Sequence, residues 1–446
     1  MVALAGGLAW QAGALNRYVC DGECGPSSII APEGLVPLAE GADAAVSGPS
    51  AGSLDAAAVQ AAVDSALGKA ALGERVGVVA LDPVTGDQLA ARGDGPFVPA
   101  STAKLLTSFA ALSVIGPQTR FATRVVRDGD RLVLVGGGDP YLVSKLPARR
   151  SYAVRADLET LADRTATALA ATRTTSVSLD WDASLFEGPA ASPAWEPDYV
   201  SGGVVSPVSA LWISEGRLDG GGRSSDPARD ATAAFATALE ERGIDVTGTP
   251  SSAPAAAAAP EVARVTGSTV AQVVEALVQS SDNEAAEVML RQVAVAGGAP
   301  ASFDGGVAET VKALRAAGVP VDGLELHDGS GLSRHNRVSP QTLAHTLLAA
   351  GEDPRTGGLL DDLPVAGFSG SLADRFVLSS DALGLARAKT GTLTGVNALA
   401  GVVTDAGGRP IVFALVADRT QAIGPLATQA ALDAVVAALA SCTCGT

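Results

Sequence analysis

The sequence predicts an α+β fold in which helices surround an antiparallel sheet and one domain is interrupted by an insertion. The first observation is an early strand pattern at 75–81, which follows an alanine-rich helical run. The second is a strongly apolar hairpin near the C-terminus, at 396–403 and 411–417. The third is the intervening stretch 124–261, in which Pro/Gly-rich loops interrupt the helix and strand patterns. A sheet whose strands come both early and late in the chain indicates an insertion between them.

The elements of the first part each have a local reason. Residues 1–52 combine an apolar N-terminal run with a Gly/Ala/Pro/Ser-rich linker, so the folded body is expected to begin near residue 53. Pro99 keeps the chain from being helical before Ser101, and an Asp-Gly-Asp turn at 128–130 joins two apolar runs. The predicted elements are a helix at 55–72, a strand at 75–81, a helix at 101–115, a hairpin at 121–127 and 131–135, a helix at 157–171 and a strand at 176–181.

The second part begins after an Ala/Pro tract at 253–260. Apolar residues at helical spacing predict helices at 270–279, 284–295, 305–317, 339–350 and 426–440. The organisation we expect is a catalytic domain made of 53–123 and 262–441, inserted domains over 124–261, and a cysteine-containing tail at 442–446.

The composition excludes several classes of protein. With 446 residues, 47% hydrophobic and 18% charged, the chain is expected to be globular, with about two or three domains. Its net charge of −17 argues against a nucleic-acid partner. The three histidines form no H-x-x-x-H pair and have no cysteine companions at metal-ligand spacing, so we expect neither a metal nor a cofactor. The chain has five lysines, and a lysine inside a chemical motif is therefore informative.

The two ends of the chain are typical of an exported protein. Residues 1–15 are apolar but lack a basic flank and fall short of the roughly 20 residues that span a bilayer. They resemble the remainder of a signal peptide or membrane anchor behind a late start codon, with a soluble tail as the alternative. Cys20 and Cys24 precede the first element, and Cys442 and Cys444 follow the last, which favours disulfides that join neighbouring termini. Three pairings are open, as is the alternative of free thiols.

An S-x-x-K motif at 101–104 places a hydroxyl and an amine on one face of a predicted helix. Ser101 lies near the helix N-terminus, so the pair has the form of a nucleophile beside its base. For Lys104 to accept the serine proton near neutral pH, burial or another cation must lower its pKa. The plain alternative is a capping serine followed by a surface lysine.

Two further motifs lie at element boundaries. An S-D-N motif at 281–283 falls between two predicted helices, where loop side chains can reach a cleft; a helix cap is the alternative. A K-T-G-T motif at 389–392 precedes the apolar hairpin, so it can form an edge strand whose lysine meets a substrate carboxylate. The probability that all three motifs occur in this order by chance is roughly one in a few hundred.

This trio is the signature of the penicillin-recognising serine acyltransferases. The first two motifs are 180 residues apart, far more than a compact β-lactamase would use. In this spacing and in four local runs the chain resembles the D-alanyl-D-alanine carboxypeptidase/endopeptidase family, the class C penicillin-binding proteins of the penicillin-binding protein 4 type, over about residues 54–440. The runs are FVPASTAKL at 97–105, LVLVGGGDP at 132–140, DGSGLSR at 328–334 and AKTGTLTG at 388–395.

The resemblance implies a transpeptidase-like domain, with helices around a five-stranded antiparallel sheet and the active site at the edge of that sheet. It implies that Ser101 attacks the carbonyl of the penultimate D-alanine and that Lys104 takes its proton. Ser281 would relay this proton to the leaving nitrogen, while Asn283 would orient the substrate amide and Lys104. The reaction would act on peptidoglycan stem peptides ending in D-Ala-D-Ala, outside the cytoplasm, and β-lactams would inhibit it.

The resemblance also implies how the leaving group is held. Lys389 would supply positive potential for the terminal carboxylate and help keep Lys104 neutral, while Thr390 and Thr392 would hydrogen-bond that carboxylate. The backbone amides of Ser101 and Thr392 would form the oxyanion hole. The preference between carboxypeptidase and DD-endopeptidase action stays open at this point, as do the oligomeric state and an N-terminal membrane association.

Two alternatives remain on the sequence alone. One is a β-lactamase-like or esterase hydrolase on the same scaffold, although no E-x-x-L-N run supplies the glutamate of a class A β-lactamase. The other is a non-catalytic peptidoglycan-binding protein, against which the intact Ser101, Lys104, Ser281 and Lys389 argue.

Overall fold

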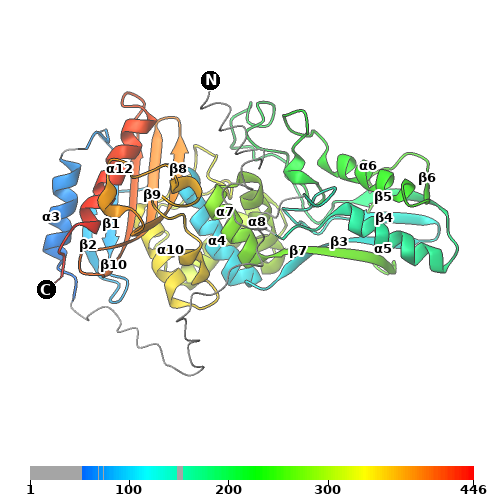
Figure 1. Ribbon diagram of the computed structural model, residues 1–446, viewed down its shortest axis with the longest axis horizontal. Helices are drawn as coiled ribbons and strands as arrows, with labels where there is room; N and C mark the ends of the chain where they lie inside the picture. The colour runs from blue at the N-terminus through cyan, green and yellow to red at the C-terminus, as the bar shows by residue number, and fades with distance from the viewer. Residues whose placement is uncertain (1–52, 69, 74, 148–153, 446) are drawn as a thin grey trace, which may run out of the picture. The chain divides into compact units, whose positions relative to one another are not determined.

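The computed structural model describes residues 53–445, apart from 69, 74 and 148–153 (Figure 1). The described chain contains two five-stranded sheets with helices packed against them. Residues 1–15 and the cysteines Cys20 and Cys24 lie outside the described residues. None of the helices in the described part of the chain has the length and apolar character needed to cross a membrane.

The first sheet is fully antiparallel and has the strand order β2-β1-β10-β9-β8. It confirms the predicted sheet, in which early strands pair with late ones. β10 occupies the centre because it is apolar throughout, whereas β8, which carries the K-T-G-T motif, lies at the edge. The strands are β1 (Val76–Leu81), β2 (Gln88–Arg92), β8 (Ala386–Leu393), β9 (Val396–Thr404) and β10 (Pro410–Asp418).

Helices cover both faces of this sheet (Figure 1). Alternate side chains of a strand point to opposite faces, so Phe413 of β10 packs in one core and its neighbour Val412 in the other. The core around Phe413 is completed by α3 (Ala56–Leu67) and α12 (Pro425–Ala440), and the core around Val412 by α4 (Lys104–Ala110) and α10 (Pro340–Glu352). The catalytic motifs therefore lie on the α4 side of the sheet.

The core on that side also includes a group of helices that follows the insertion. Of these, α7 and α8 are separated only by the S-D-N motif, because Ser281 ends α7 and Asp282 caps α8. The group comprises α7 (Val270–Ser280), α8 (Asn283–Gly297), α9 (Phe303–Ala316) and the short α11 (Gly358–Asp361).

The second sheet has the order β6-β5-β4-β3-β7 and mixes parallel and antiparallel pairs. The helices α5 (Leu158–Ala171) and α6 (Pro227–Glu240) pack against it. The predicted insertion begins at residue 124, which lies inside β3, and ends at residue 261, the first residue of β7. The division into domains stays a prediction. The strands are β3 (Arg120–Asp128), β4 (Arg131–Val135), β5 (Ser176–Asp182), β6 (Asp245–Thr247) and β7 (Glu261–Thr269).

Three elements of this region were not predicted: α6, the three-residue strand β6, which pairs with β5, and β7. The expected loops contain α6, whose buried face combines Phe235 and Leu239 with alanines and a threonine. Pro/Gly-rich segments on both sides of it favoured a loop assignment. They also lead into β7, whose exposed positions are charged and polar and which becomes a strand by pairing with the distant β3. Pairing with β3 decided the conformation of β7.

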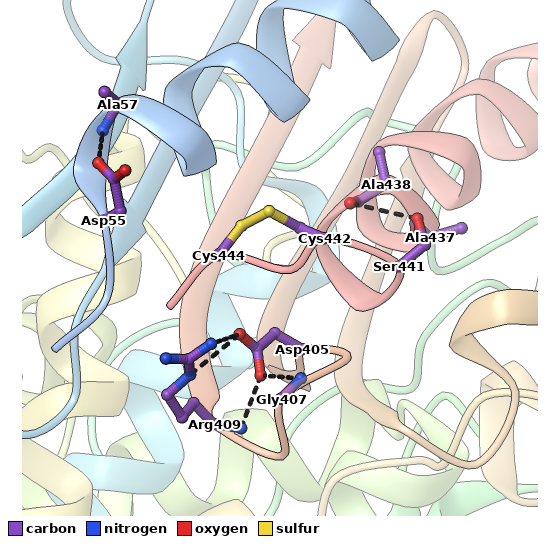
Figure 2. The surroundings of a disulfide bond; sticks show 10 residues. All are labelled: Asp55, Ala57, Asp405, Gly407, Arg409, Ala437, Ala438, Ser441, Cys442 and Cys444. Atoms are coloured by element: carbon purple, nitrogen blue, oxygen red, sulfur yellow. Dashed lines mark hydrogen bonds and ion pairs between the residues drawn. A yellow bond between two sulfur atoms is a disulfide. The ribbon is translucent and has the colours of Figure 1, made fainter. Parts of the chain in front are cut away.

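The two C-terminal cysteines form a disulfide with each other (Figure 2). We had expected disulfides between the two ends of the chain instead. The disulfide joins Cys442 to Cys444, whose Cα atoms are 5.1 Å apart. The start and end of the described chain are nevertheless neighbours, since the backbone N–H of Asp55 donates to the carbonyl of Cys444 at 2.7 Å. These two segments are joined by backbone pairing. No disulfide among the described residues links them.

Candidate active site

Ser101 lies in a 3-10 helical turn (η2, Ala100–Ala103) that leads directly into α4. The preceding residue, Ala100, has a φ of 47°, a left-handed conformation that alanine rarely adopts. A Cβ atom on Gly331 would lie 1.9 Å from the carbonyl oxygen of Ala100, so only glycine allows this close approach. The turn that presents Ser101 is therefore held in a strained conformation by its neighbours, as is common at active sites.

Lys104 is fully buried one helical turn after Ser101. Its Nζ atom lies 2.9 Å from Ser101 Oγ, 2.8 Å from Asn283 Oδ1 and 2.6 Å from the carbonyl oxygen of Ser330. Burial lowers the pKa of Lys104 to about 8, although nearby carboxyl groups, Glu287 foremost, act in the opposite direction. An amine with this pKa is partly neutral near pH 7 and can accept the serine proton.

The S-D-N motif reaches the same place because of how the two helices meet. Ser281 has a φ of 60° and a ψ of 40°, so the chain turns sharply at the end of α7. Asp282 then caps α8 through its carboxylate, which accepts from the backbone N–H of Ala285 at 3.0 Å. The capping role was the plain alternative for this motif, and here it directs Ser281 and Asn283 toward the two lysines.

The K-T-G-T motif forms part of edge strand β8. Lys389 is fully buried and donates to Ser281 Oγ at 2.8 Å, which connects the second and third motifs. A Cβ atom on Gly391 would lie 2.7 Å from the carbonyl oxygen of Pro99 and 3.2 Å from the backbone nitrogen of Thr102. Glycine at this position therefore lets β8 pack directly against the turn that carries Ser101.

The outer edge of β8 presents backbone donors. The N–H of Ala388 donates outward, to the carbonyl of Pro364 at 2.9 Å. Alternate residues of a strand direct their N–H groups to the same side, so the amides of Thr390 and Thr392 face the same edge. The Thr392 amide, for which the resemblance implies a role in the oxyanion hole, therefore lies on the outer edge of the sheet.

The two lysines repel each other. Burial and then the positive charge of Lys104 lower the pKa of Lys389 well below its ordinary value. The charge of Lys104 thus disfavours the charged form of Lys389, whereas burial is the cause that lowers the pKa of Lys104. The expectation that Lys389 helps to keep Lys104 neutral stays a prediction, because the lowered pKa of Lys104 is caused by burial.

Three supporting contacts were not predicted. Glu287 accepts from the backbone N–H groups of Gly329 and Ser330, both at 2.9 Å, and so holds the loop whose Ser330 carbonyl contacts Lys104. Thr390 Oγ1 donates to Ser371 Oγ at 2.9 Å. The DGSGLSR run at 328–334 contributes to the family resemblance, but it does not indicate a contact with Lys104. Nothing in the sequence distinguishes Ser371 from other loop serines.

A cavity of about 640 Å³ adjoins the S-D-N motif. One wall consists of residues 280–284, and the other comes from loops of the region between the first two motifs, including Glu215, Arg217 and Arg223. Within the described residues, no group of three His, Cys, Asp or Glu side chains could hold a metal ion.

Comparisons with known proteins agree with this geometry. The D-Ala-D-Ala carboxypeptidase 3 (S13) family matches residues 59–220 and 218–440. A carboxypeptidase of Mycobacterium tuberculosis is 38% identical over 93% of this chain and 88% of its own length. A D-alanyl-D-alanine carboxypeptidase of Actinomadura is 29% identical over 82% of this chain and 81% of its own length.

The solved structures agree on the fold. The crystal structure of penicillin binding protein 4 from Haemophilus influenzae has a TM-score of 0.72 at 22% identity, and the match covers 84% of this chain and 97% of that one. The family match extends over nearly the whole described chain and includes all three motifs, which confirms the resemblance. With a serine next to a buried lysine at the sheet edge, this chain belongs to the D-Ala-D-Ala carboxypeptidase 3 (S13) family and is a serine-type D-Ala-D-Ala carboxypeptidase.

Proposed function

We propose that the chain works through an acyl-enzyme on Ser101, with Lys104 as the general base. The observation that carries this proposal is the 2.9 Å contact between Lys104 Nζ and Ser101 Oγ at a fully buried lysine whose pKa is about 8. A surface lysine with an ordinary pKa would stay protonated and could not take the proton.

The proposed reaction has two steps. Ser101 Oγ attacks the carbonyl carbon of the penultimate D-alanine, Lys104 Nζ takes the hydroxyl proton, and the amides of Ser101 and Thr392 stabilise the oxyanion. The C–N bond then breaks, and the proton passes through Ser281 to the leaving nitrogen. Water hydrolyses the resulting ester and restores Ser101. Asn283, which contacts Lys104 Nζ, keeps that amine in position throughout.

The carboxylate of the leaving D-alanine is proposed to bind at β8. Lys389 supplies the positive charge, and the hydroxyls of Thr390 and Thr392 supply hydrogen bonds. The contact between Lys389 and Ser281 at 2.8 Å supports this assignment, because it puts the carboxylate site next to the proton relay.

The proposed substrates are peptidoglycan stem peptides that end in D-Ala-D-Ala, and β-lactams are the proposed inhibitors. The family match and the curated carboxypeptidases support this substrate class. The enzyme therefore acts outside the cytoplasm. An association of residues 1–15 with the membrane stays a prediction.

Labelling with a fluorescent penicillin tests the proposal, since a β-lactam acylates the same serine. The intact protein should give a stable fluorescent band on a denaturing gel, and Ser101→Ala should give none. Release of D-alanine from a pentapeptide ending in D-Ala-D-Ala should disappear in the same variant. A band of equal strength in Ser101→Ala would exclude Ser101 as the nucleophile.

We also propose DD-endopeptidase action, in which the leaving group is the side-chain amine of a neighbouring stem. The cavity of about 640 Å³ beside Ser281 supports this proposal, because a single D-alanine does not need so large a space. Incubation with a crosslinked muropeptide dimer should yield two monomers, and Ser101→Ala should yield none.

A further inference from the structure

The cavity beside the S-D-N motif contains features that D-alanine release does not use. Ligand clefts commonly have volumes of about 300–1,000 Å³, and this one has about 640 Å³. It starts at Ser281, whose Oγ contacts Lys389 and which is assigned to protonate the leaving nitrogen. The cavity therefore extends from the leaving-group side of the reacting bond.

The far wall of the cavity is rich in guanidinium groups. Arg217 is half exposed, with 49% of its side chain accessible, and it contacts Glu215 at 3.1 Å and Glu284 at 3.5 Å. Arg223 lies deeper and contacts Glu284 at 2.7 Å. A guanidinium has five N–H donors in a planar fork, more than these carboxylates occupy, so Arg217 has capacity for a further carboxylate.

Glu215 is the second feature that points to a ligand. The residue is 6% exposed, and its Oε1 atom has no hydrogen-bond partner among the described residues. Burial, the negative charge of Asp282 and a hydrogen bond with the Asp282 side chain raise the pKa of Glu215 well above its ordinary value, so repulsion of an incoming anion is reduced. An N–H group of a ligand would satisfy Oε1.

The backbone around Glu215 is strained. Ser214 and Glu215 have φ values of 50° and 59°, and neither is glycine. The hydroxyl of Ser206 donates to the carbonyl of Glu215 at 2.5 Å and fixes this conformation. Consecutive left-handed residues of this kind are costly and are typical of functional loops.

We propose that this cavity binds the leaving stem peptide of a crosslink, with a carboxylate of that peptide at Arg217 and a peptide N–H at Glu215. The proposal deepens and rests on the proposed DD-endopeptidase function. In the step concerned, the ester to Ser101 forms as the crosslink amide breaks, and the departing amine takes the proton from Ser281. The segment 214–223 would thereby contribute to substrate selection.

Steady-state kinetics on two substrates tests the proposal. Arg217→Gln should raise the KM for a crosslinked muropeptide dimer by about tenfold, which corresponds to about 1.4 kcal/mol, while the KM for an uncrosslinked pentapeptide changes by less than about twofold. Arg217→Lys keeps the charge and should have a smaller effect on the dimer. Arg229→Gln is the matched control, because this arginine is also exposed, with 71% of its side chain accessible, and pairs with Asp226 on α6 away from the cavity.

The outcomes separate the two proposals. An unsubstituted enzyme that releases D-alanine but does not cleave the dimer would refute the DD-endopeptidase function itself. Cleavage of the dimer with an equal KM change for both substrates, or with no change for either, would refute only the assignment of the cavity. The rate of penicillin labelling in each variant shows whether the site around Ser101 is intact.

Discussion

Acylation of Ser101 should rise steeply with pH between about 6 and 9, because Lys104 must be neutral to accept the proton. Burial lowers the pKa of Lys104 to about 8, and the groups that oppose this shift are the carboxyl groups of Glu287, Asp328, Asp282 and Glu284. The perturbation is the pH of the labelling buffer, and the measured quantity is the rate constant for acylation by a fluorescent penicillin.

The magnitude follows from this pKa. With a pKa of about 8, about a tenth of the molecules carry a neutral Lys104 at pH 7 and about half at pH 8. With the ordinary value of 10.5, only about 3 in 10,000 would be neutral at pH 7. Burial of Lys104 thus increases the reactive fraction at pH 7 by about 300-fold.

The assay compares the intact protein with Lys104→Arg, whose guanidinium stays charged at every pH of the series. The intact protein should label about fivefold faster at pH 8 than at pH 7 and reach a plateau near pH 9. Lys104→Arg should label slowly and without this rise. A flat profile in the intact protein, or a rise that begins only above pH 10, would refute the role of Lys104 as a buried base.

The same shift makes stability depend on pH. The folded-state pKa of Lys104 lies below its unfolded value, so between about pH 8 and 10.5 the unfolded chain binds a proton that the folded chain does not. The free energy of unfolding should therefore rise over this window, with a contribution of about 3 kcal/mol from Lys104. Denaturant titrations at pH 7.5 and 9.5 should show about 2 kcal/mol of this change, and Lys104→Met should reduce it.

Three further predictions concern other parts of the site and the sheet. The KM for a peptide ending in D-Ala-D-Ala should rise with pH, because the lowered pKa of Lys389 makes its charged form harder to keep; a C-terminally amidated peptide should show no such rise. Gly391→Val should slow penicillin labelling by at least about tenfold, since a Cβ atom 2.7 Å from the carbonyl oxygen of Pro99 displaces β8 from the serine turn; Gly358→Val, at a glycine with free space around it and an ordinary φ, tests for general effects of glycine replacement. Arg375→Met should lower the free energy of unfolding by about 3–5 kcal/mol, because it leaves the buried Asp433 carboxylate without its cation; an equal stability in denaturant titration would contradict this.

The local sequence was sufficient for much of the fold. The strand at 75–81, the hairpin at 396–417 and the helix at 426–440 are strongly apolar segments bounded by turn residues, and they form as predicted. The prediction missed α6, which lies between Pro/Gly-rich segments, and β7, which pairs with the distant β3. Propensity and periodicity are local properties, whereas the pairing of distant strands is not.

For the site, the sequence was sufficient to select Ser101, Lys104, the S-D-N motif and the K-T-G-T motif. The residue types and the order of these motifs are typical of a serine acyltransferase site. The sequence could not specify the pKa of Lys104, which depends on complete burial and on contacts with Asn283 and Ser330. Nor could it reveal Glu215, which lies on a loop of weak pattern and reaches the S-D-N motif only through tertiary packing. Burial and electrostatic coupling arise between residues far apart in the chain, so only the folded structure determines them.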